Sequence, residues 1–197
     1  MDQQTINVYD ELAREYDVET KDFWETFPKT IIDVFAELAA GKVLDIGSGP
    51  GRDGLILKQH GFEVVCLDAS KEMVKLSSQN GFSSVVGDFN SLPFPDKSFD
   101  AVWAYTSLLH CKKSEIGRAI GEIKRVLKTN GVFFLGMIEG NAEIYRESSG
   151  VEKPRLFSFY KKDALEDLLR QFGFEVVYFE QFQPKTKNYL NFICRKI

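Results

Sequence analysis

The stretch Val43-Leu44-Asp45-Ile46-Gly47-Ser48-Gly49-Pro50-Gly51-Arg52-Asp53-Gly54, or VLDIGSGPGRDG, decides the fold. A short apolar run leads into four glycines within eight residues, and a helical pattern follows them. A strand that runs into a glycine turn and a helix N-terminus typically binds a nucleotide-like ligand, because glycine lets the backbone approach closely and the first helical N–H groups point outward. Dinucleotides, nucleoside triphosphates and adenosyl sulfonium compounds all use versions of this turn, so the rest of the chain has to discriminate between them.

Strands and helices alternate along the chain on the far side of this turn. The pattern predicts strands at 42–46, 62–67, 83–86, 99–104 and 132–137, and helices at 53–59, after Ser70 and at 114–128. Two amphipathic helical segments precede the turn, one with Tyr9 and Tyr16 on its apolar face. The segments 174–182 and 189–194 are two strands joined without a helix, which indicates a terminal antiparallel hairpin. We therefore predict an α/β fold, with a doubly wound, mostly parallel sheet that has helices on both faces.

Composition restricts the class of protein further. The chain has 197 residues, enough for one domain, and a net charge of -4 with no basic stripe, so nucleic acid is not expected as a partner. The three cysteines lie far apart and no Cys/His spacing suits a metal, which predicts reduced thiols and no metal site. The N-terminal segment is polar and no apolar run reaches the ~18 residues of a membrane span, so we expect a cytoplasmic protein that does not enter the membrane.

The glycines allow two descriptions. Gly49, Gly51 and Gly54 match the GxGxxG spacing of dinucleotide-binding turns. Such turns start their glycines directly at the strand end, here Gly47, and Arg52 then occupies the position of the third glycine. The better description is an acid in the strand, Asp45, followed by glycines at every second position.

In this second description the chain resembles the class I S-adenosylmethionine-dependent methyltransferases, in their small-molecule branch, over nearly its whole length. The segments that carry the resemblance occur in the family's order, and they are Asp45–Gly51, Asp68, Gly87-Asp88-Phe89, Ser98–Trp103, Glu122–Gly131, and the pairs Tyr9-Asp10 and Tyr16-Asp17. The resemblance implies a seven-stranded sheet of order 3-2-1-4-5-7-6 and S-adenosyl-L-methionine as cofactor. It also implies one methyltransferase-like domain over 1–197, with a helical lid at 1–40.

The resemblance assigns roles to individual residues. The glycine turn would hold the methionine portion with help from Arg52, Asp68 would accept the ribose hydroxyls, and Asp88 with the amide of Phe89 would meet the adenine. The expected cofactor-binding residues are Tyr16, Asp45, Gly47, Ser48, Gly49, Gly51, Arg52, Asp68, Ala69, Met73, Asp88, Phe89 and Ala104.

Several of these residues also have ordinary structural interpretations. Asp68 could cap the helix that follows Ser70, Arg52 could be a solvated first-turn residue, and Tyr16 could be a core aromatic residue. His110, after the fourth strand, is a candidate catalytic base or a structural histidine.

Two segments are expected to form the acceptor pocket: the N-terminal lid with its aromatic residues, and the stretch 139–160, which is too long for a plain connection. Methyl transfer from a sulfonium is an in-line displacement, and whether it needs a base depends on the acceptor. The sequence after the fourth strand, Ala104-Tyr105-Thr106-Ser107, lacks an Asp-Pro-Pro-Tyr-like motif, which argues against exocyclic amines of nucleobases. The function predicted is methyl transfer to a small-molecule acceptor. A cofactor-binding protein without transfer, or an NAD-type oxidoreductase, remains an alternative, and the oligomeric state stays open.

Overall fold

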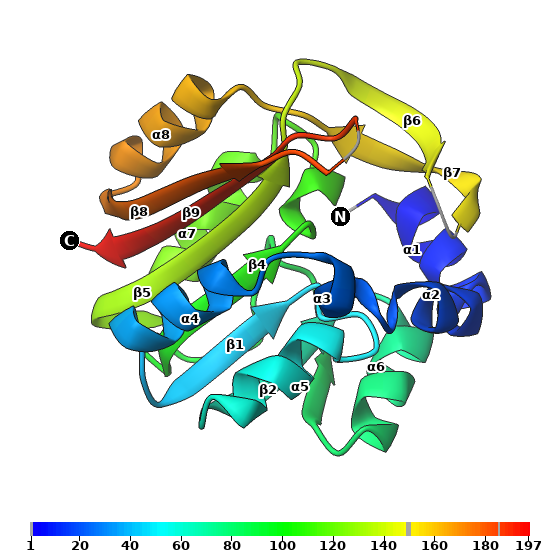
Figure 1. Cartoon of the computed structure of the whole chain (residues 1–197), viewed down its shortest axis with the longest axis horizontal. Coiled ribbons are helices and arrows are strands. Elements are labelled where there is room, and N and C mark those ends of the chain that lie inside the picture. Colours follow the sequence, from blue (N-terminus) through cyan, green and yellow to red (C-terminus); the bar gives the residue numbers. More distant parts are fainter. Residues whose placement is uncertain (1, 149–150, 185) are drawn as a thin grey trace.

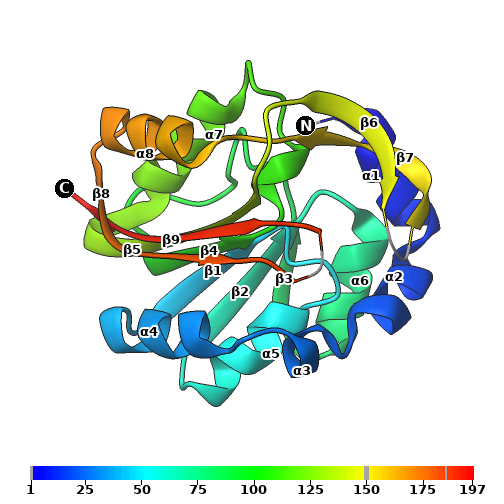
Figure 2. The same ribbon diagram turned by 45° about the horizontal axis from the view of Figure 1, so that its top comes forward.

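The computed structural model describes residues 2–148, 151–184 and 186–197. A seven-stranded sheet forms its centre, with α4 and α5 on one face and α7 and α8 on the other (Figures 1 and 2). The helices are α1 Gln3–Glu11, α2 Ala13–Thr20, α3 Phe23–Thr26, α4 Thr30–Leu38, α5 Arg52–Gln59, α6 Lys71–Gln79, the 3₁₀ turn η1 Leu108–His110, α7 Ile116–Val126 and α8 Lys162–Gln171. The strands are β1 Lys42–Ile46, β2 Glu63–Asp68, β3 Ser83–Val86, β4 Phe99–Tyr105, β5 Leu127–Ile138, β6 Glu143–Ser148, β7 Val151–Ser158, β8 Phe174–Phe182 and β9 Tyr189–Lys196.

The strand order confirms the predicted topology. The sheet runs β3-β2-β1-β4-β5-β9-β8, in which β8 and β9 are the sixth and seventh strands of this sheet. The first five strands are parallel, and β9 is antiparallel to both β5 and β8. The strand order runs outward from β1 in both directions, to β2 on one side and to β4 on the other, so the loops after β1 and β4 diverge at the carboxyl ends of these strands and leave a crevice. Open α/β sheets bind ligands at such a crevice.

A hairpin of β6 and β7 forms a second sheet that was not predicted as strands. It lies within the stretch 139–160 and arches from the end of β5 to the N-terminal helices (Figure 2). Gln4 Nε2 donates to the carbonyl of Pro154 at 3.0 Å, and the amide of Leu156 donates to Thr5 Oγ1 at 3.0 Å. The hairpin and α1 therefore form one continuous wall above the crevice.

Two predicted elements were wrong in detail. The first helical segment is divided at Leu12, whose backbone (φ -111°, ψ 25°) leaves helical geometry and lets α2 turn away from α1. The helix predicted at 114–128 ends at Val126, because Leu127 already pairs with Phe99 in the sheet. Lys128, expected in that helix, instead forms an ion pair with Asp100 at 2.7 Å.

Aromatic side chains fill the core beneath the crevice. The rings of Trp103 and Phe134 stack with centroids 3.8 Å apart, and Phe35 of α4 meets Trp103 edge-on at 5.0 Å. All three side chains are fully buried. This packing fixes β4 under the crevice, so the residues after β4 have a rigid base.

Candidate active site

The glycine turn lies at the end of β1 and approaches the loop after β4 closely. Gly47, Gly49 and Gly51 have φ of 66°, 54° and 90°, a region that side-chain-bearing residues rarely adopt. A Cβ on Gly47 would lie 2.3 Å from the Cβ of Ser107. The absence of a side chain at Gly47 therefore lets the turn and the β4 loop form two walls of one narrow cavity.

Asp68, at the end of β2, holds this turn from below. Its Oδ2 accepts a hydrogen bond from the amide of Gly49 at 2.9 Å, and its Oδ1 accepts one from the amide of Ser70 at 2.9 Å. Ser70 Oγ is itself the cap of α6 and accepts from the amide of Met73 at 3.1 Å. Burial raises the pKa of Asp68 to about 6, and the nearby Asp10 adds to the rise.

A second carboxylate, Asp45, lies buried within β1. It is 2 % exposed, and its Oδ2 has no hydrogen-bond partner in the part of the chain that the structure describes. Burial together with Asp53 raises the pKa of Asp45 well above the ordinary value. Desolvated acids that lack a cationic partner make the surrounding site favourable for a positively charged ligand.

Asp53, in the first turn of α5, accepts hydrogen bonds from three side chains, a role that the sequence does not indicate. Its Oδ1 accepts from Trp24 Nε1 at 2.8 Å and from Arg52 Nε at 2.7 Å, and its Oδ2 accepts from Trp103 Nε1 at 3.0 Å. The Arg52 guanidinium lies over the Phe23 ring, 4.2 Å from its centroid. Asp53 thus joins α3, α5 and β4 and fixes the orientation of Arg52.

The N-terminal helix α1 covers the inner cavity. On the side of α6, Asp10 accepts a hydrogen bond from Ser70 Oγ at 2.7 Å. On the other side, Thr5 Oγ1 accepts one from the amide of Leu156 in β7. The inner cavity measures about 60 Å³. Its walls contain Thr5, Ile6, Tyr9, Tyr16, Gly47, Ser48, Gly49, Pro50, Arg52, Asp53, Leu67, Asp68, Ala69, Ser70, Met73, Gly87, Phe89, Tyr105, Thr106, Ser107 and His110.

His110 belongs to a buried hydrogen-bonded chain. Its Nδ1 lies 2.6 Å from the carbonyl of Leu156, which can only accept, so Nδ1 carries the proton. Nε2 then accepts from the Tyr9 hydroxyl at 2.8 Å, and the Tyr9 oxygen accepts from Arg155 Nη1 at 2.6 Å. Burial, with a smaller contribution from the charge of Arg155, lowers the pKa of His110 to about 3.

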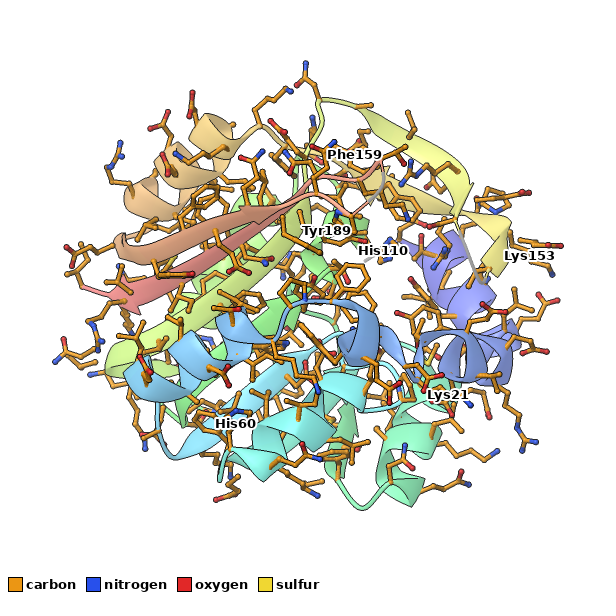
Figure 3. The ribbon with its side chains drawn as sticks, viewed as in Figure 1. Lys21, His60, His110, Lys153, Phe159 and Tyr189 are labelled. Carbon is orange, nitrogen blue, oxygen red and sulfur yellow. The ribbon has the colours of Figure 1, made fainter. Side chains whose placement is uncertain are left out.

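An outer cleft of about 760 Å³ adjoins the inner cavity. The two share Tyr9, Tyr16, Arg52, Thr106 and His110 as walls. The remaining walls of the outer cleft are Glu19, Thr20, Asp22, Phe23, Phe27, Leu109, Ile138, Ser148, Arg155, Phe157, Pro184, Thr186, Lys187 and Tyr189. Figure 3 shows His110 and Tyr189 near the centre of the molecule, below the β6-β7 hairpin, whereas His60 lies at the opposite edge.

The residues predicted to bind the cofactor lie mostly at this crevice. The walls of the inner cavity contain Tyr16, Gly47, Ser48, Gly49, Arg52, Asp68, Ala69, Met73 and Phe89. Asp45, Gly51, Asp88 and Ala104 lie outside these walls. Asp45 and Ala104 are buried within strands, and Gly51 begins α5, where a Cβ would lie 2.7 Å from the Phe82 ring.

Sequence reasoning missed other wall residues. Thr106 and Ser107 follow β4 and carry no motif, although their place after a strand next to β1 is a usable signal. Trp24, one of the aromatic residues of the N-terminal lid that the sequence analysis expects in the acceptor pocket, is instead buried against Asp53. Lys187 comes from the turn between β8 and β9 and could not be assigned to the cleft without the fold.

No described helix is long and apolar enough to cross a membrane. The described residues include no cluster of three or more His, Cys, Asp or Glu side chains that could hold a metal ion.

Comparison with known proteins finds a methyltransferase domain and its fold. Residues 44–135 match the model of a methyltransferase domain. The demethylmenaquinone methyltransferase of Thermotoga maritima is 26% identical, and the match covers 91% of this chain and 90% of that protein. A crystal structure of a SAM-dependent methyltransferase from Methanosarcina mazei superimposes with a TM-score of 0.76 at 22% identity, over 87% of this chain and 98% of that one.

A second structure has its ligands bound. The 1,6-didemethyltoxoflavin-N1-methyltransferase of Burkholderia thailandensis, solved with 1,6-didemethyltoxoflavin and S-adenosylhomocysteine, has a TM-score of 0.73 at 23% identity, over 97% of this chain and 87% of that one. Residues 44–135 therefore match a methyltransferase domain, and the chain has the fold of the S-adenosylmethionine-dependent methyltransferases, with S-adenosyl-L-methionine as its cofactor.

Proposed function

We propose that this protein transfers the methyl group of S-adenosylmethionine to a small-molecule acceptor bound in the outer cleft. The observation that carries the proposal is the wall shared by the two cavities, made of Tyr9, Tyr16, Arg52, Thr106 and His110. A donor bound at the glycine turn and an acceptor in the cleft would meet at this wall. The cleft volume of about 760 Å³ lies within the ~300–1,000 Å³ of small-molecule sites.

The residues at the glycine turn fit the donor. The hydroxyl oxygen of Ser107 is buried beside Gly47 and has no hydrogen-bond partner among the described residues, so it is available to a ligand, while a Cβ at Gly47 would clash with the Ser107 side chain. Asp68 has acceptor capacity beyond its two backbone bonds, because an ionised carboxylate has about four lone-pair sites. When bound, the donor supplies an electrophilic methyl group on a positively charged sulfur. The buried carboxylates Asp45 and Asp68 suit this charge better than they suit a pyrophosphate.

The chain's own residues would act by positioning and by excluding water. Holding two reactants in line can supply ~7–11 kcal/mol of the barrier. Tyr16, whose ring carbon Cε1 lies 3.6 Å from a Cβ built on Gly49, and Tyr9 would shield the meeting point from solvent. Buried Arg52 would be held in place by Asp53 and Phe23 for the donor's carboxylate.

His110 would position the wall instead of abstracting a proton. Its only lone pair accepts the Tyr9 hydroxyl, and its lowered pKa makes it a weak base near neutral pH. This favours an acceptor that needs no strong base, such as an amine, a thiol, or an acid that is already ionised.

The segment 1–40 would act as a lid and 139–160 as an acceptor-binding insertion. An inner cavity of about 60 Å³ is smaller than a typical ligand site, so α1 would have to move outward for the donor to enter. The two related proteins named for their acceptors, demethylmenaquinone and 1,6-didemethyltoxoflavin, act on small organic molecules, which supports this class of acceptor.

Two measurements test the proposal. S-adenosylmethionine and S-adenosylhomocysteine should each raise the melting temperature by binding the folded state, while NAD and ATP should not. Methyl-labelled donor, incubated with a panel of small acids, amines, thiols and phenols, should then label at least one of them. A melting shift with NAD alone would overturn the assignment. Donor binding with no labelling across the panel, and none with cell-extract metabolites, would favour a binding protein without transfer.

A further inference from the structure

Three basic side chains lie close together at one end of the outer cleft, whose walls include Arg155 and Lys187. Arg146 of β6 lies directly opposite Arg155 of β7 in the hairpin register. Burial, together with the charges of Arg146 and Arg155, lowers the pKa of Lys187. Like charges directly opposite on paired strands are destabilising. Among the described residues, none of the three forms an ion pair with an acid.

The two arginines are also incompletely hydrogen-bonded. Arg155 is only 3 % exposed, and neither its Nε nor that of Arg146 has a hydrogen-bond partner among the described residues, although both atoms are buried. A buried guanidinium N–H that lacks an acceptor destabilises the fold unless a ligand provides one. Within residues 2–148, 151–184 and 186–197, Lys187 Nζ donates a hydrogen bond to Ser148 Oγ alone, at 3.4 Å.

Aromatic rings hold these cations in place. The Arg146 guanidinium lies over Phe157 and Phe159, 4.7 and 4.8 Å from their centroids, and Arg155 lies over Tyr9 at 4.9 Å. The acids of the cleft wall, Glu19 and Asp22, come from α2 and the turn after it and form no ion pair with the basic cluster. The cleft therefore combines an oriented positive end with apolar walls that include Phe23, Phe27 and Phe157.

We propose that the methyl acceptor is a small organic anion, whose oxyanion group binds Arg155 and Lys187 of the cleft wall with the charge of Arg146 beside them, while its apolar body lies against the phenylalanines of the cleft. Arginine and lysine bind carboxylate and phosphate oxygens through charge-assisted hydrogen bonds, and an apolar body gains from leaving water. The inference rests on the proposed function, because it describes the occupant of the acceptor cleft.

A matched pair of fluorescent probes tests the cluster. With the protein saturated in S-adenosylhomocysteine, 8-anilinonaphthalene-1-sulfonate and its neutral counterpart N-phenyl-1-naphthylamine are titrated and their Kd values compared. Lys187→Gln and Arg146→Gln should each weaken binding of the sulfonate by about tenfold and leave the neutral probe within twofold. Lys75→Gln, an exposed lysine on α6 that pairs with Glu72, should change neither Kd. Both test residues are only half-buried, so their replacement should leave folding intact, which circular dichroism checks.

Displacement of the sulfonate identifies the acid. Benzoate and phenyl phosphate are used as competitors against the neutral benzamide, and the more effective anion names the acceptor's acidic group. Displacement by benzamide at the same concentration as by both anions would overturn the inference, as would an unchanged sulfonate Kd in Lys187→Gln and Arg146→Gln. Calorimetric titration of S-adenosylhomocysteine is run in parallel: normal donor binding and methyl transfer without anion preference refute this inference alone, whereas anion preference without any transfer refutes the proposed function.

Discussion

The Tyr9 hydroxyl donates a hydrogen bond to His110 Nε2 across 2.8 Å and thereby occupies the only lone pair of that imidazole. The lowered pKa of about 3 keeps His110 uncharged. We predict that the His110 ring resonances do not titrate between pH 5 and pH 8. The chain has two histidines, so heteronuclear NMR with His110→Gln assigns both signals. A His110 signal that titrates within this range would contradict the tautomer and the buried environment.

The same histidine should make the protein sensitive to acid. Its folded pKa lies below the unfolded value of 6.5, so its contribution to stability is present above pH 6.5 and is lost as the pH falls. Between pH 7.5 and pH 5 the unfolding free energy should drop by about 2 kcal/mol more in the wild type than in His110→Gln. Asp68, with its raised pKa, acts in the opposite direction but equally in both proteins. Urea unfolding at the two pH values measures the difference, and parallel losses would exclude His110 as the cause.

Asp68 should control donor binding through its charge. Because its pKa is raised to about 6, the carboxylate that would accept the ribose hydroxyls is lost as the pH falls below 6. The Kd for S-adenosylhomocysteine should rise about tenfold between pH 7.5 and pH 5. Asp68→Asn should weaken binding about tenfold at pH 7.5 and make it nearly independent of pH. Calorimetric titration provides both values, and a pH-dependent Kd in the variant would assign the effect to another group.

Asp53 should matter for stability more than any exposed acid. Asp53→Ala would leave the indole N–H groups of Trp24 and Trp103 and the Arg52 guanidinium without their shared acceptor. Loss of one partner in such a buried network costs about 3–5 kcal/mol. Asp33→Ala, which removes an exposed carboxylate that pairs with His60, is the matched control and should change little. Equal unfolding free energies of the two variants in urea would show that the network contributes no stability.

The N-terminal lid should become ordered when donor binds. Lys21, in the turn between α2 and α3, is exposed and accessible to trypsin (Figure 3). We predict slower cleavage after Lys21 in the presence of S-adenosylhomocysteine, because local opening of the lid precedes proteolysis. Cleavage at the exposed Lys161, outside the lid, should not change and serves as the internal reference. Identical rates at Lys21 with and without the ligand would argue that segment 1–40 does not act as a lid.

The alternating part of the fold could be predicted from the sequence because local signals and tertiary structure agree there. Strands 42–46 and 83–86 were predicted with their observed bounds, since apolar runs between turn residues form buried parallel strands. The β6-β7 hairpin could not be predicted, because β6 is exposed or half-buried along its whole length, and the strands carry Glu143, Arg146 and Glu152 without a regular apolar alternation. Such strands lack the alternation of apolar and polar residues by which a half-buried strand is predicted from sequence.

The residues expected to bind the donor were easier to predict than those of the acceptor cleft, because they lie closer together in the sequence. A glycine turn and an acid at the end of the next strand are close in sequence, so their spacing is informative. Arg155 and Lys187 come from different hairpins and meet only after the whole sheet has formed. The Trp24–Asp53–Trp103 network depends on contacts over 29 and 50 residues of sequence, which no local pattern encodes.

Helix α1 touches α6 through Asp10 and Ser70, and β7 through Thr5 and Leu156, so one element borders both cavities. Occupancy of either cavity must then change the free energy of placing α1 over the other. Such linkage is reciprocal: the factor by which donor alters affinity for acceptor equals the factor by which acceptor alters affinity for donor. On the proposed function, α1 would couple the binding of the two reactants, and the Kd of each measured with and without the other would give the sign and size of that coupling.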